Sequence, residues 1–198
     1  MLQKAIKKKE IESELQKALV QNPRIITIKA ALRDDFEITS RVLSELISMG
    51  YKGVLLSAFK SATEFMQQIK DRGIHWADNI MVIDAISVSY GVAEKGVTNI
   101  NGVDFVEGPF SLDDIYKCAT EAINNIKSEK KFLFVDSVMA FLLYNEEKRI
   151  TDFLSKLMNL GEKMDGLSVL ITQPESAYVI PVEKIKTLNP SIEFSIAD

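Results

Sequence analysis

Apolar residues along the chain follow two patterns, which are short β-branched runs and stretches with helical spacing. Runs such as Ile80-Met-Val-Ile-Asp84 are apolar on both faces, and they predict strands at residues 24–30, 53–58, 80–84, 131–136 and 167–172. Apolar residues that recur every three or four positions predict helices at residues 10–20, 37–49, 61–72, 111–126 and 146–160. Continuously apolar strands that alternate with helices predict a three-layer α/β domain, whose sheet has at least five strands and is mostly parallel.

The segments outside these runs have weaker patterns. Residues 85–110 contain four glycines and no helical period, so loops and a hairpin are expected there. Gly161 is expected to follow the end of the last helix, where glycine is common. Residues 192–196 alternate in the manner of an exposed or edge strand. We divide the chain into an N-terminal helical extension (1–21), whose first eight residues fray or pack separately, and an α/β domain (22–198).

Composition narrows the classes of function. With 46% hydrophobic and 26% charged residues, the chain has the make-up of an ordinary globular protein. The net charge of −4 argues against non-specific binding of nucleic acid, and no nucleic-acid partner is expected. The single cysteine, Cys118, cannot form an internal disulfide, which predicts a reducing, cytoplasmic location. No apolar run reaches the roughly 18 residues of a membrane span, so no membrane partner is expected.

Polar residues end three of the predicted strands. Asp84 and Asp136 each end an apolar run, and Gln173 follows the last one. Parallel α/β sheets bind their ligands at the carboxyl ends of the strands, so we expect any site at this edge. The run Phe132-Leu-Phe-Val-Asp136 has the form of a Walker B strand, whose carboxylate organises the magnesium of a bound nucleotide. A turn-forming aspartate would produce the same pattern.

The segment Phe132-Leu-Phe-Val-Asp-Ser-Val-Met-Ala-Phe-Leu-Leu-Tyr144, a helix, and then Leu167-Ser-Val-Leu-Ile-Thr-Gln173 together resemble the RecA/KaiC family of P-loop ATPases. The resemblance covers about residues 24–173. It implies a RecA/KaiC-like domain with a nucleotide site, in which Asp136 is the candidate magnesium ligand and Gln173 is the candidate contact to the γ-phosphate.

Two departures from the family concern its catalytic machinery. The connection Ala31-Leu-Arg-Asp-Asp-Phe-Glu37 has no glycine and no lysine, although the family's phosphate-binding Walker A loop needs both. The family's catalytic glutamate falls by register on Phe59 or Lys60, and neither side chain accepts a proton from water at neutral pH. We therefore expect a degenerate member with no catalytic residues and no cofactor. Such a domain is expected to act as a regulator or scaffold that binds either itself or a related active ATPase.

Alternatives remain open. An unusual ATP-binding protein or ATPase could use Asp136 with ATP and magnesium, bound weakly. A receiver-like signalling domain would use Asp34-Asp35 as its acidic pair and Asp84 as its phosphoacceptor. Against the receiver, the acidic pair lies beyond the strand, Gln173 replaces the expected lysine, and the segment after Asp84 is too long. The apolar stripe of the helix at 10–20 either docks a partner or packs on the chain's own sheet.

Overall fold

The computed structural model describes residues 2–31, 35–73, 78–95, 102–174 and 192–197. Its strands are β1 (Leu2–Lys7), β2 (Ile25–Ala30), β3 (Lys52–Ser57), β4 (Ile80–Asp84), β5 (Val103–Phe105), β6 (Lys131–Asp136), β7 (Leu167–Pro174) and β8 (Ile192–Ala197). They form one sheet in the order β1-β8-β2-β7-β6-β3-β4-β5, and every neighbouring pair is parallel. The prediction of a largely parallel α/β sheet is confirmed.

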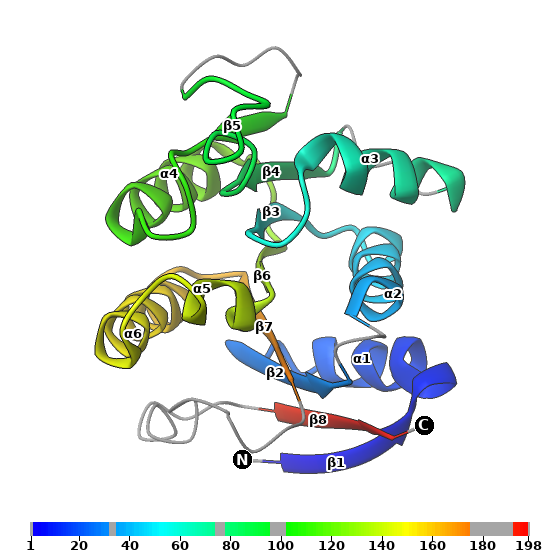
Figure 1. Ribbon diagram of the computed structural model, residues 1–198. Helices are drawn as coiled ribbons and strands as arrows, with labels where there is room; N and C mark the ends of the chain where they lie inside the picture. The colour runs from blue at the N-terminus through cyan, green and yellow to red at the C-terminus, as the bar shows by residue number, and fades with distance from the viewer. Residues whose placement is uncertain (1, 32–34, 74–77, 96–101, 175–191, 198) are drawn as a thin grey trace.

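Helices cover both faces of the sheet (Figure 1). One face carries α1 (Ile11–Leu19), α2 (Asp35–Ser48) and α3 (Ala62–Asp71), and a short 3-10 helix η1 (Lys8–Glu10) precedes α1. The other face carries α4 (Leu112–Asn125), α5 (Val138–Leu142) and α6 (Glu147–Lys163). The result is a three-layer arrangement with one hydrophobic core on each side of the sheet.

The alternation of side chains along each strand explains the two cores. In β6, Leu133 and Val135 pack in the core under α4–α6, whereas Phe132 and Phe134 pack in the core under α1–α3. Because successive side chains of a strand point to opposite faces, a central strand covered on both faces is apolar at most of its positions. This requirement produces the continuous apolar runs that identify the strands in the sequence.

Both ends of the chain differ from expectation. Residues 2–7, which we expected to fray or pack separately, form strand β1, which pairs in parallel with β8. Strand β8, which we expected to be an exposed or edge strand, therefore lies between β1 and β2. The two partners come from opposite ends of the chain, so no local pattern reveals their pairing. Helix α1 forms as expected, and its stripe, including Ile11 and Leu15, is fully buried against the sheet rather than exposed for docking.

Two further expectations are corrected. Within residues 85–110 the structure shows β5 paired in parallel with β4, not a hairpin, although 96–101 lie outside the described residues. Helix α6 continues through Gly161, which is buried inside the helix instead of following its end. A Cβ atom at Gly161 would lie 2.7 Å from Cγ2 of Val169, so this glycine permits close packing of α6 on β7.

Candidate functional site

The candidate residues from the sequence do meet at one edge of the sheet, at the carboxyl ends of the strands. Ser57, the last residue of β3, pairs in register with both Asp84 and Asp136. The two aspartates therefore lie on either side of one strand end. Gln173 stands near the end of β7, next to β6.

Asp136 is buried beside the hydroxyl of Thr172. The Thr172 Oγ1 atom lies 3.5 Å from Asp136 Oδ1 and donates a hydrogen bond of 3.2 Å to the carbonyl of Val135. Oxygen atoms of this kind are suitable ligands for magnesium. Within the described residues, however, no group of three His, Cys, Asp or Glu side chains could hold a metal. A magnesium ion at Asp136 would therefore depend on oxygens from a bound phosphate or from water.

Gln173 does not join Asp136. Side chains alternate along β7, so Gln173 and Thr172 point to opposite faces of the sheet. Gln173 is paired in register with Lys29 of β2, whose ammonium lies 3.3 Å from the buried carboxylate of Glu193. Gln173 is itself buried, and within the described part of the chain neither its Nε2 nor its Oε1 has a hydrogen-bond partner.

The carboxylate of Asp84 is fully buried and accepts four hydrogen bonds. Oδ2 accepts from the backbone N–H of Ala62 and the hydroxyl of Ser87, both at 2.6 Å. Oδ1 accepts from the backbone N–H groups of Ile86 at 2.9 Å and Ser87 at 2.8 Å. Asp84 thus joins the start of α3 to the loop after β4. A carboxylate with its lone pairs occupied in this way is poorly placed to attack a phosphoryl donor.

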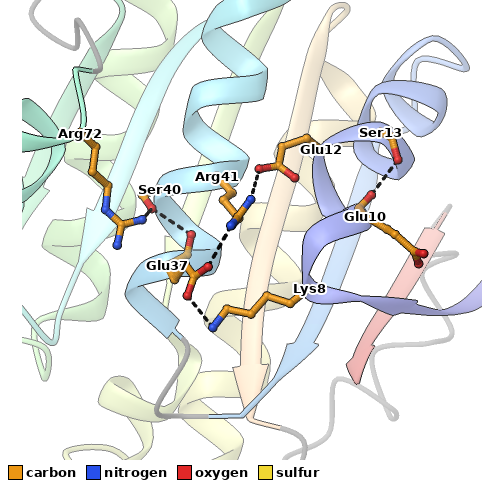
Figure 2. Close-up of polar contacts among 8 residues, drawn as sticks. All are labelled: Lys8, Glu10, Glu12, Ser13, Glu37, Ser40, Arg41 and Arg72. Carbon is orange, nitrogen blue, oxygen red and sulfur yellow. Dashed lines mark hydrogen bonds and ion pairs between the residues drawn. The ribbon is translucent and has the colours of Figure 1, made fainter. Parts of the chain in front are cut away.

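Ion pairs surround the first turn of α2 (Figure 2). The carboxylate of Glu37 lies 2.5 Å from the ammonium of Lys8 and 3.0 Å from Nη2 of Arg41. Arg41 also donates to Glu12, at 2.5 Å. The hydrogen bond from Lys8 holds the pKa of Glu37 below its ordinary value, against the opposing effect of partial burial. Residues 32–34 and the side chain of Asp35 lie outside the described residues, so the acidic pair is not placed.

A pocket of about 410 Å³ opens at the same edge, at the ends of β3 and β4 and beside α5. Five exposed apolar side chains line it, and we call them the carboxyl-edge patch: Phe59, Tyr90, Val92, Leu143 and Tyr144. Seven large apolar side chains are exposed in the described part of the chain, and these are five of them. Single exposed apolar residues are normal on protein surfaces, but a cluster around one pocket marks a candidate binding site.

Sequence reasoning missed the carboxyl-edge patch. It treated Phe59 only as the residue in the position of a catalytic glutamate. Tyr90 and Val92 lie in a glycine-containing segment without periodicity, and Leu143 and Tyr144 follow α5, a short helix that was not predicted. The sequence feature that could have indicated the patch is the presence of large apolar residues in loops, outside any helix or strand that would bury them.

Comparison with known proteins identifies the fold. No protein-family model and no curated protein matches this chain. Among solved structures, a KaiC-like protein from the hyperthermophilic archaeon Pyrococcus horikoshii is similar, with a TM-score of 0.61 and 14% identity. The match covers 88% of this chain and 73% of that chain. The chain has a KaiC-like fold. At 14% identity the similarity concerns the fold alone. No helix among the described residues is long and apolar enough to cross a membrane.

Proposed function

We propose that this chain is a non-catalytic KaiC-like domain that binds another protein through the carboxyl-edge patch, as a regulatory or scaffolding module. The observation that carries the proposal is the gathering of exposed apolar side chains, three of them aromatic, around one pocket. Aromatic residues are enriched at the centres of protein interfaces, where they supply much of the binding energy. Their exposure in the isolated chain is accounted for if a partner covers them.

The surroundings of α2 support a degenerate Walker A region. A phosphate at a helix N-terminus is held by backbone N–H groups and by cations. Here the first turn carries Glu37, and the neighbouring cations Lys8 and Arg41 are paired with carboxylates of this chain. A triphosphate would have to compete with these carboxylates and would be repelled by them. The described residues around the first turn of α2 therefore disfavour a bound nucleotide, and we propose no ATP or magnesium cofactor.

The proposed partner is a second copy of the chain or a related active ATPase of the same fold. The stripe of α1 is buried, which leaves the carboxyl edge as the favoured contact surface. The cytoplasmic location also stays a proposal. A cytoplasmic location is compatible with the half-buried Cys118. Burial raises the pKa of its thiol, so the thiol is poorly reactive.

Photocrosslinking in the cells of origin tests the protein-binding proposal. Leu143 is replaced by p-benzoylphenylalanine, and irradiation is expected to give discrete crosslinked products. The matched control places the same group at Val20, which is 77% exposed. Val20 follows α1 and precedes β2, so it lies toward the amino-terminal ends of the strands, away from the carboxyl-edge patch. Identical products from both positions, or none from position 143, would contradict the proposal.

A second measurement tests the nucleotide alternative. Isothermal titration of ATP with magnesium is expected to show no binding tighter than the millimolar range. Micromolar binding that is lost in Asp136→Asn would support an unusual ATP-binding protein instead. Light scattering after size exclusion identifies the kind of partner, because a mass above 22.2 kDa indicates self-association.

A further inference from the structure

The lining of the patch pocket has a distinct chemistry. Three aromatic side chains (Phe59, Tyr90 and Tyr144) share it with Glu64 of α3. Glu64 is exposed, and among the described residues that line the pocket it is the one with a charged side chain; none of these described residues is basic. The faces of aromatic rings carry partial negative charge and attract cations, most strongly in cages of several rings. A carboxylate beside such rings adds to the attraction.

Two features organise this lining before anything binds. The side chain of Tyr144 interacts with that of Tyr90, which raises the pKa of Tyr144 above its ordinary value. Ser87, in the wall of the pocket, is held by the carboxylate of Asp84 through its hydroxyl and its backbone N–H. This places a second carboxylate directly behind the pocket wall.

The basic side chains near the pocket in sequence are engaged elsewhere. Lys60 follows Phe59, and its ammonium lies 3.2 Å from Oε1 of Gln68 and 4.1 Å from the ring centre of Phe36. The Nε2 group of Gln68 in turn donates to Oε1 of Glu64 at 3.2 Å, so Lys60 is connected to Glu64 only through this amide. Lys95, downstream of Tyr90, is paired at 2.7 Å with Asp114. Neither lysine therefore forms a direct ion pair with Glu64.

We infer that the pocket binds a lysine or arginine side chain of the partner protein, and that apolar residues beside this cation pack on Leu143 and Val92. This inference rests on the proposed function and names the chemistry of the partner segment, which is basic and flanked by apolar residues. Charge complementarity favours this occupant, because a pocket with aromatic rings and a carboxylate accepts a cation on a long aliphatic stem better than a neutral or acidic group.

Selection from a random peptide library displayed on phage tests this inference, with the full chain immobilised. Enriched peptides are expected to carry Lys or Arg next to aliphatic or aromatic residues. An enriched peptide is then synthesised with a fluorescent label, and its affinity is measured by anisotropy. Replacing the basic residue of this peptide by Gln is expected to weaken binding about tenfold, because the variant peptide loses both the cation–π contact with the rings and the ion pair with Glu64.

Matched variants of the chain locate the binding. Glu64→Lys and Tyr144→Leu are each expected to weaken the peptide about tenfold. Glu129→Lys makes the same charge change at an exposed position just before β6, where the amino-terminal ends of the strands lie. This variant is expected to leave binding unchanged. Circular dichroism confirms that each variant is folded, and Glu64→Gln serves in place of Glu64→Lys if that variant unfolds.

The outcomes separate this inference from the proposed function. Enriched peptides without a basic residue, or equal binding to Glu64→Lys and the wild-type chain, would overturn the inference. The proposed function would survive that result if photocrosslinking at Leu143 succeeds. If selection yields no peptide and position 143 gives no crosslink, both the inference and the proposed function are wrong.

Discussion

Replacing Asp84 with asparagine tests the role of the most completely bonded carboxylate at the site edge. In the wild-type chain this buried group accepts from two backbone N–H groups and a hydroxyl in the loop after β4, and from the first N–H of α3. Asparagine has nearly the same shape, but it removes the charge. It also turns an NH2 group toward donors that need an acceptor.

The expected cost follows from these four contacts. A hydrogen bond to a charged group contributes about 1.5–3 kcal/mol, against about 0.5–1.5 for a neutral one, and an unsatisfied buried donor costs about 1–3 kcal/mol. Because such terms are not additive, we expect Asp84→Asn to lower the free energy of unfolding by about 3–4 kcal/mol. That is a large part of the roughly 5–15 kcal/mol that stabilises a typical domain.

Urea unfolding followed by circular dichroism measures this loss, which should lower the midpoint by about 1–2 M. The control is Asp113→Asn on α4, whose side chain is 83% exposed and lies 3.0 Å from Lys156. A surface pair of this kind is expected to change stability by less than about 0.5 kcal/mol. Equal losses in the two variants would refute the structural role of Asp84. Incorporation of phosphate from acetyl phosphate, lost in Asp84→Asn, would support the receiver alternative.

Two other substitutions test the surroundings of the site. The pKa of Glu37 is lowered by its hydrogen bond from Lys8, so its stabilising effect is full above pH 5 and is lost as the pH falls below 4.5. Glu37→Gln should therefore reduce stability by about 0.5 kcal/mol at pH 7 and by less at pH 3, and an equal loss at both values would contradict this. Gln173→Leu removes a buried amide that has no hydrogen-bond partner among the described residues, so the free energy of unfolding, measured by thermal unfolding, should rise by about 1 kcal/mol. A fall in the free energy of unfolding would show that the amide has a partner in the folded chain.

The central layer of the fold could be predicted because its signals are local. The four consecutive apolar residues of Phe132-Leu-Phe-Val-Asp136 by themselves predict a strand buried on both faces. The structure confirms this strand as β6, Lys131–Asp136. The capping box at Ser61 and Glu64 likewise marks the start of α3, where the hydroxyl of Ser61 accepts from the backbone N–H of Glu64 at 3.2 Å.

Features that depend on distant segments could not be predicted in this way. Leu2 pairs with Ile192, and neither segment alone indicates whether it lies at an edge or inside the sheet. The same limit applies to the site. Asp136 and Gln173 both end strands, and the sequence places them at one edge. Only the register shows that Thr172, not Gln173, lies on the Asp136 face.

Phe59 is common to both parts of the proposed function, which are the expected absence of catalysis and the binding of a partner. By resemblance to RecA/KaiC ATPases, the catalytic glutamate falls on Phe59 or Lys60. The ammonium of Lys60 contacts Gln68 and the ring of Phe36, whereas Phe59 is 63% exposed on the rim of the pocket. An aromatic ring in place of a carboxylate cannot activate water, and it adds apolar surface that is unfavourable in water unless a partner covers it. Under the proposed function, this one residue would account both for an absence of hydrolysis and for part of the contact surface. On this argument, Phe59→Glu should weaken partner binding without creating an ATPase, because the sequence of residues 31–37 would still contain no glycine and no lysine.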